Sequence, residues 1–282
     1  VYYKVIGDKN HNDLAVQSVP VTIARKELTA ITIELTPESF VYDGAVHMPT
    51  VTVKDGKTVL PEEEYTWKCT QSDGTEVAAP INQGTYTIEI SDATGGNYDL
   101  SKLAVSDREA TFSIGRAAQA ELVIGGKPSP TNYGDTFTLS TTGGSGTGTV
   151  TWSVTGTAAT VNASTGAVKI TGVGEVTITA TNPGDQNYES VSAQWTFTAA
   201  PKPVTASVTV ADRAYDGTTD ATVASAGITA LNGDTVTIAP ASITAVFDTP
   251  AAGTGKTVRL DASKAQVTGA DAAKYTISYP AN

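Results

Sequence analysis

The sequence contains few of the residues on which most catalytic and metal sites depend. Among 282 residues there are one cysteine, one methionine and two histidines, and 18 Lys and Arg stand against 29 Asp and Glu. A lone cysteine cannot form an internal disulfide. A net charge of -11 disfavours nucleic acid as a partner, because a nucleic-acid groove needs clustered basic side chains. No stretch approaches the roughly 18 consecutive apolar residues of a membrane span, so we expect no membrane insertion.

The residues that are abundant favour strands and turns. The chain has 46 threonines, together with 26 glycines and 13 prolines. Threonine is enriched in strands, and glycine and proline mark turns. Apolar and polar residues alternate in several segments, as in Ile31–Leu35, Val176–Ala180 and Val204–Val210. A period of two predicts antiparallel strands with one buried face, and the sequence therefore indicates an all-β protein.

Internal repeats divide the chain into modules. An Asn-aromatic or related pair recurs at residues 10, 97, 187 and 274, with spacings of 87, 90 and 87 residues. Tyr-Asp-Gly or Tyr-Gly-Asp triplets recur from residues 42, 133 and 215. A third marker pairs Val21–Arg25 with Phe112–Arg116. This period suits β-sandwich domains of about 100 residues, and we expect boundaries that give segments 1–25, 26–115, 116–200 and 201–282.

Two of these segments are expected to be incomplete modules. Residues 1–25 carry only the closing part of a repeat, and the closing strand of the segment 201–282 is expected only from about residue 282 onward. An open module presents an unpaired strand edge or an unfilled groove. We therefore expect strand exchange at the incomplete modules, with the added strand coming from another molecule or from Val1–Arg25.

Three motifs carry a resemblance to known families. Val150–Ser153, Ala159–Gly166 and Val173–Ala180 resemble the group 2 bacterial immunoglobulin-like domain of surface adhesins. The flanking segments resemble the YDG and MBG repeats of bacterial cell-surface proteins, through Tyr42–Gly44 with Val51–Gly56 and through Tyr215–Thr219 with Gly269–Tyr275. The resemblance implies tandem immunoglobulin-like antiparallel β-sandwich modules in an elongated array. It also implies an extracellular location on a bacterial cell surface.

Aromatic residues supply the candidate binding positions. Trp67 and Trp152 share strand parity with apolar neighbours, so we expect both in the core, as in immunoglobulin-type sandwiches. Trp195, Tyr98 and Tyr188 lie near repeat ends. Exposed aromatic rings there could stack on sugar rings, and we take these three as the candidate ligand-stacking residues.

Other chemistry is less well supported by the sequence. Asp and Asn cluster in the repeat-end loops, but turns also require them, and no loop has the spacing of an EF-hand. His11 and His47 lie in no catalytic or zinc pattern, Glu62–Glu64 are interpreted as a solvated turn or strand start, and Cys69 is interpreted as a buried small hydrophobe. We therefore predict no catalytic residue, no cofactor and no metal site, and hence no enzyme.

Two functional hypotheses remain. The favoured one is a non-catalytic spacer that projects a functional head from a bacterial surface. The alternative is an adhesin module that binds a glycan or a host extracellular protein through the three aromatic residues named above.

Overall fold

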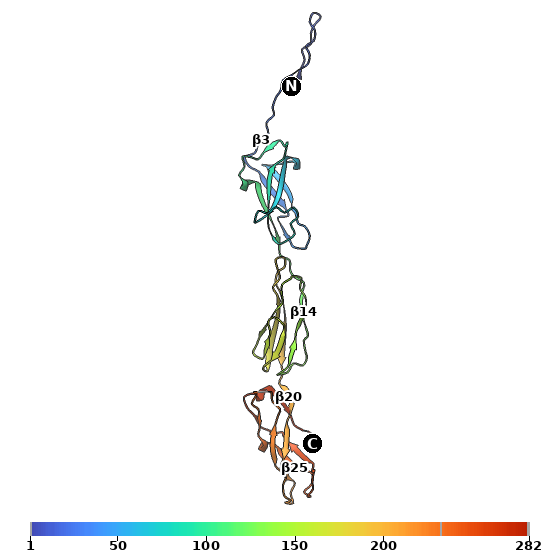
Figure 1. Ribbon diagram of the computed structural model, residues 1–282, viewed down its shortest axis with the longest axis vertical. Coiled ribbons are helices and arrows are strands. Elements are labelled where there is room, and N and C mark those ends of the chain that lie inside the picture. Colours follow the sequence, from blue (N-terminus) through green and yellow to red (C-terminus); the bar gives the residue numbers. More distant parts are fainter. Residues whose placement is uncertain (1, 232, 281–282) are drawn as a thin grey trace. The chain divides into compact units, whose positions relative to one another are not determined.

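The computed structural model describes residues 2–231 and 233–280, and its described part is built from strands, with four short 3-10 helices and no α-helix. None of the described helices is long and apolar enough to cross a membrane. The chain forms two compact units, residues 1–117 and 118–282. Their strands can be followed by colour in Figure 1. The predicted all-β fold is confirmed.

The N-terminal segment of the first unit is almost entirely solvent-exposed. It contains one antiparallel pair, β1 (Tyr2–Tyr3) and β2 (Gln17–Ser18). Residues 19–25 follow β2 without belonging to any strand. Of residues 2–25, Gly7 alone is even half-buried, so this segment adds nothing to a core.

The first module, residues 26–115, is a sandwich of two sheets. The sheets have the strand orders β5-β11-β9-β8 and β4-β6-β7, and β3 pairs with β10. A single apolar cluster lies between them and contains Leu35 and Val53 from one sheet and Ile88 and Phe112 from the other. The strands are β3 (Lys26–Glu27), β4 (Thr32–Thr36), β5 (Ser39–Val41), β6 (Thr50–Asp55), β7 (Thr58–Val59), β8 (Tyr65–Gln71), β9 (Gly84–Asp92), β10 (Tyr98–Asp99) and β11 (Glu109–Gly115), with 3-10 helices η1 (Glu62–Glu64) and η2 (Val105–Arg108).

The second module, residues 116–200, has its own apolar cluster. Val176, Ile178 and Ala180 are fully buried on one face of β18, while the residues between them are half-buried, as the alternation in the sequence predicts. The three sheets are β12-β14, β13-β17-β16 and β15-β18-β19. The strands are β12 (Leu122–Gly125), β13 (Thr136–Thr138), β14 (Ser140–Gly143), β15 (Thr151–Thr155), β16 (Ala159–Val161), β17 (Ala167–Ile170), β18 (Gly174–Asn182) and β19 (Val191–Ala199).

The third module, residues 201–282, has a smaller core in which Ala206, Ile238 and Ile243 are the buried members among the described residues. Its sheets are β20-β28, β21-β23, β22-β25-β26 and β24-β27. The strands are β20 (Lys202–Thr205), β21 (Ser207–Val210), β22 (Asp220–Ala221), β23 (Val223–Gly227), β24 (Thr237–Ile238), β25 (Thr244–Phe247), β26 (Val258–Asp261), β27 (Val267–Thr268) and β28 (Tyr275–Ser278), with 3-10 helices η3 (Pro240–Ser242) and η4 (Ala272–Lys274).

Most strand pairs are antiparallel, as predicted, but three are parallel. The strand that opens the first module, β3, pairs in parallel with the late strand β10, and β20 does the same with β28 in the third module. The third parallel pair joins β5 to the closing strand β11. In each of these pairs, a strand near the start of a module lies beside one near its end and both run in the same direction. Alternation of polarity in the sequence does not encode that direction.

Candidate functional site

The connection between the second and third modules, which lies within the second unit, is held on both sides by backbone hydrogen bonds. The Tyr133 amide donates to the Ala200 carbonyl at 2.8 Å, and the Ala200 amide donates to the Thr131 carbonyl at 2.9 Å. Beyond Pro201, Lys202 opens β20 directly opposite Tyr275 of β28. The loop that carries Tyr133 and the strand that carries Tyr275 are therefore fixed close to the two ends of a one-proline linker.

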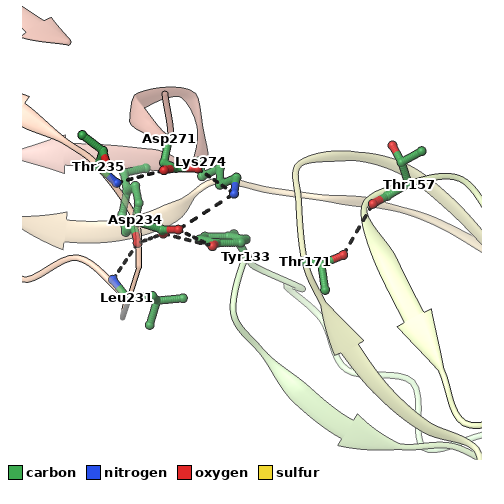
Figure 2. A network of polar contacts seen from close by, with 9 residues as sticks. Tyr133, Thr157, Thr171, Leu231, Asp234, Thr235, Asp271 and Lys274 are labelled. Carbon is green, nitrogen blue, oxygen red and sulfur yellow. Dashed lines mark hydrogen bonds and ion pairs between the residues drawn. The ribbon is translucent and has the colours of Figure 1, made fainter. Parts of the chain in front are cut away.

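Asp234 joins these two tyrosines. The Tyr133 hydroxyl lies 3.0 and 2.9 Å from the two carboxylate oxygens of Asp234, and the Tyr275 hydroxyl also donates to this carboxylate. The Tyr275 oxygen in turn accepts from the Leu231 amide at 2.8 Å. Figure 2 shows the Asp234 carboxylate directed toward the Tyr133 hydroxyl. The Asp234 side chain is only 9% exposed, so this negative charge depends on the phenol donors for solvation.

A lysine completes the network. Lys274 Nζ lies 4.9 Å from the centroid of the Tyr133 ring and 3.9 Å from Asp234 Oδ1. It forms a shorter ion pair, 2.8 Å, with Asp271, whose other oxygen accepts from the Thr235 amide at 2.8 Å. The ring of Tyr133 and the carboxylate of Asp271 together hold the ammonium group between the modules. We call Tyr133, Asp234, Lys274 and Tyr275 the joint.

The protonation states of the joint follow from this environment. Burial raises the pKa of Tyr133 and of Tyr275, and the hydrogen bonds to Asp234 act in the same direction. The hydrogen bond to Asp271 raises the pKa of Lys274. Near neutral pH both phenols are therefore neutral donors and the lysine is a cation. The joint is a set of matched donors and acceptors, and its chemistry is that of holding two modules together.

The backbone at the joint leaves no room for a side chain on the glycine that follows Tyr133. Gly134 has a φ of +86°, and a Cβ placed on it would lie 2.5 Å from Leu231 Cδ1. A residue other than glycine would be strained there and would push the Leu231 loop away.

Three of the four joint residues were visible in the sequence, and only as repeat markers. Tyr133 belongs to the triplet that recurs from residues 42 and 215, and Lys274–Tyr275 is the last of the Asn-aromatic pairs. Two of the candidate stacking residues, Tyr98 and Tyr188, belong to the same series of pairs as Lys274–Tyr275. No marker indicated Asp234, because its partners lie 101 and 41 residues away in the chain.

Trp195, the first candidate stacking residue, lies against the core of the second module. Its ring stacks on Phe197 at 4.1 Å and meets Phe137 edge-on at 6.0 Å. It is half-buried on the inward face of β19. The tryptophan is therefore held by intramodular ring contacts on the side that faces the core.

Tyr98 and Tyr188, the other two candidates, belong to different units. Tyr98 is half-buried in β10 and packs against the first core, and its carbonyl accepts a hydrogen bond from Arg25. It pairs with Lys26 as Tyr275 pairs with Lys202, so it occupies the position of a joint residue. Tyr188 is half-buried in a loop organised by Asp185, which accepts from its amide at 3.0 Å.

Trp67 is a correction to the sequence analysis, which placed it in the core. Trp152 is buried, as predicted, but Trp67 is 42% exposed, although Tyr65 and Cys69 on the same face are buried. The reason is that β8 is the edge strand of its sheet. An edge strand has a neighbour on one side only, and an indole there keeps part of its surface in water.

Glu64 is a second correction. The triplet Glu62–Glu64 forms η1, but Glu64 is buried and is not part of a solvated turn. Its two carboxylate oxygens accept from the amide and the side-chain Nδ2 of Asn97, each at 2.6 Å. The Asn of the repeat-end loop is thereby tied to the start of β8.

The remaining candidates for chemistry have local structural partners. His47 stacks on Phe40 at 4.7 Å and lies 2.9 Å from Asp43. Cys69 is buried, as predicted, and burial raises the pKa of its thiol. Asp185 accepts from the Thr147 amide at 2.9 Å, a bond that holds the pKa of its carboxyl below the usual value. Among the described residues there is no group of three or more His, Cys, Asp and Glu side chains that could hold a metal ion.

Comparison with known proteins identifies the two outer modules. Residues 29–125 match the MBG domain model and residues 200–282 match the YDG domain model. The resemblance predicted for the flanking segments is thereby confirmed, and the chain contains an MBG domain followed by a YDG domain. No curated protein matches the chain.

Two solved structures are similar to the chain at low identity. A C-terminal fragment of intimin, solved in complex with the intimin-binding domain of the translocated intimin receptor, is 18% identical, with 64% of this chain and 67% of that chain covered and a TM-score of 0.24. The three N-terminal domains of the highly immunogenic outer capsid protein (Hoc) of bacteriophage RB49 are 12% identical, with coverage of 82% and 78% and a TM-score of 0.24. Because both TM-scores are below 0.5, these two likenesses carry no argument. The outer modules are identified by the family matches alone.

Proposed function

We propose that the chain is a non-catalytic spacer of a bacterial surface protein, in which the second and third modules are locked to one another so that a distal head is held in position. A spacer can set the position of a head only if its modules do not swing independently. The joint is the observation that carries the proposal: Asp234 accepts from tyrosines of two modules, and the linker between them is a single proline held by hydrogen bonds at both sides.

The families found at both ends of the chain support the same role. The MBG and YDG domains that match the chain are the repeats that the flanking segments were predicted to resemble. That resemblance implied a bacterial cell-surface protein. His47 and Glu64, two side chains of the kinds that acid–base chemistry uses, are engaged in packing and hydrogen bonding within the first module.

Distance measurements between spin labels test the spacer proposal directly. Labels at Thr160→Cys and Ala224→Cys, both exposed positions, report on the second and third modules. The native Cys69 is buried, so it does not compete for the label. We expect a narrow distance distribution, which Asp234→Ala broadens. A broad distribution in the otherwise unaltered chain would reject a fixed joint and with it the spacer role.

An adhesin module is the second candidate function, and Trp67 is the observation that favours it. An indole that is 42% exposed on an edge strand offers a flat apolar face to a sugar ring or to a host protein. A binding screen against glycans and matrix proteins should include Trp67→Ala, with Trp195→Ala as the comparison. Binding that is lost in Trp67→Ala but kept in Trp195→Ala would favour this function. If the unaltered chain binds nothing in the screen, the spacer function remains favoured.

A further inference from the structure

The first module is open along one side, between the start of β4 and the start of β11. β4 is the edge strand of its sheet, and no strand in the described part of the chain pairs with its outer flank. β5 pairs with β11 only from Ser113 to Gly115, so the flank of β11 before Ser113 is also without a strand neighbour among the described residues. A groove of about 490 Å³ lies here, lined by Thr29–Ile33 on one wall and by Ser106, Asp107 and Glu109 on the other.

The outer flank of β4 directs backbone hydrogen-bonding groups toward this groove. The Val53 carbonyl of β6 accepts from the Leu60 amide at 2.9 Å, so it points away from β4. Val53 lies opposite Ile33 in the antiparallel register. Two opposed residues of an antiparallel pair either bond to each other or both point outward. The amide and carbonyl of Ile33 therefore point away from β6, whereas those of the next residue, Glu34, point toward it.

The charge of the groove is negative and is not balanced within the module. Asp107 and Glu109 are exposed, and neither forms an ion pair in the described part of the chain. The nearby bases are engaged elsewhere: Lys54 binds Glu34 at 2.6 Å and Lys68 binds Glu89 at 2.9 Å. Arg108, which lies between the two groove acids in the sequence, donates from its guanidinium to the Ile90 carbonyl at 3.3 Å.

The first module as a whole carries most of the negative charge of the chain. Residues 26–115 contain 15 acidic and 6 basic side chains, which gives a net charge of -9 out of -11 for the whole chain. A second copy of this chain is therefore a poor occupant of the groove, since like charges would face one another. A partner of opposite charge is attracted both by the groove and by the surface around it.

The lining of the groove combines this charge with apolar surface. Ile31 and Ile33 pack against the first core but are only half-buried, and both line the groove. Lysine and arginine side chains suit such a lining, because their aliphatic stems cover apolar surface while their charged ends reach a carboxylate. A small cation would satisfy the acids but would leave the isoleucines and the outward backbone groups of β4 without a partner.

We propose that this groove binds an extended, lysine- or arginine-rich segment of another protein, which adds as a strand beside β4. Its backbone pairs with the amide and carbonyl of Ile33. Its basic side chains lie across the two isoleucines and reach Asp107 and Glu109. The groove belongs to the first unit and the joint to the second, so this docking surface does not depend on the spacer proposal.

The test is titration of the full chain with a short, end-blocked peptide of alternating lysine and threonine, followed by amide hydrogen exchange. The Ile33 amide should become protected, whereas protection of the Glu34 amide, which points to β6, should not change. Asp107→Asn combined with Glu109→Gln should weaken binding by about three- to tenfold, as expected for two exposed ion pairs. Glu62→Gln combined with Glu63→Gln is the matched control, because it removes two exposed charges of the same module outside the groove.

A second peptide separates strand addition from attraction between charges alone. The same sequence with every backbone nitrogen methylated keeps its charges but has no amide donors, and it should bind much more weakly. Equal binding of the two peptides would overturn the proposal, and so would no binding at millimolar concentration or an equal loss in the control variant. Protection of Ile33 that rises with the concentration of the chain alone would mean that a second copy fills the groove, which also overturns a basic partner as the occupant.

Discussion

Removal of a single hydroxyl should loosen the joint by a predictable amount. In Tyr133→Phe the ring keeps its place beside Tyr275, whose centroid lies 5.7 Å away, and under Lys274. What is lost is the hydrogen bond to Asp234. Although the hydroxyl lies near both carboxylate oxygens, it has one proton and donates to one oxygen at a time. The change therefore removes one hydrogen bond to a charged group, which corresponds to about 1.5–3 kcal/mol.

A loss of this size raises the population of the open joint by about ten- to a hundredfold, since 1.4 kcal/mol is a factor of ten. Two amides report on it. The Leu231 amide donates to Tyr275 and the Thr235 amide donates to Asp271, so both are protected while the network is intact. Hydrogen exchange followed by mass spectrometry should show faster exchange at both in Tyr133→Phe. Exchange in β11 of the first module should not change.

Tyr279 provides a matched control in the same module. Its hydroxyl is buried and has no hydrogen-bond partner among the described residues. Because an unsatisfied buried hydroxyl is destabilising by about 1–3 kcal/mol, Tyr279→Phe should leave the third module unchanged or more stable. If Tyr133→Phe changed exchange at Leu231 and Thr235 no more than Tyr279→Phe does, the joint would not couple the modules and the reasoning above would be wrong.

Three further predictions concern the joint and the first core. Gly134→Ala should destabilise the joint by about 1–2 kcal/mol or more, measured as a lower thermal midpoint, because of its φ of +86° and a contact of 2.5 Å with Leu231. Alkaline pH should also loosen the joint, because burial raises the pKa of both its tyrosines. The stability that the two phenols contribute is complete below their ordinary pKa near 10, and it is lost as the pH rises through their higher pKa values in the folded protein. Phenolate absorbance and hydrogen exchange, both measured over the same pH range, test this. Glu64→Ala should destabilise the first module by about 2–3 kcal/mol in urea unfolding, because two donors of Asn97 lose their acceptor, and Glu64→Gln should cost less.

The sequence was a sufficient guide to the strands and to most of the core. Alternation predicted the inward faces of β4 and β18 correctly, because a half-buried strand requires a period of two. It failed at Trp67, where parity gave the correct face but could not reveal that β8 is an edge strand. Parity fixes the side of a sheet on which a residue lies, whereas coverage depends on which strands are neighbours.

The joint shows a different kind of failure. Three of its four members were singled out as periodic markers, yet their contacts depend on the fourth, Asp234, which has no periodic counterpart among the markers. Glu64 was missed for a related reason, because its partner Asn97 lies 33 residues away. A buried carboxylate is recognised by the donors around it, and those donors are assembled only when the chain has folded.

The parallel pairing of β20 with β28 determines how the third module bears mechanical load. Tension applied at residue 201 and at residue 280 pulls these two adjacent strands in opposite directions along their length. The hydrogen bonds between them, from Lys202 opposite Tyr275 to Thr205 opposite Ser278, then share the force in shear rather than breaking one after another. Strands β20 and β28 therefore resist the force together. Under tension, we expect the described module to unfold only when all the hydrogen bonds between these two strands break together.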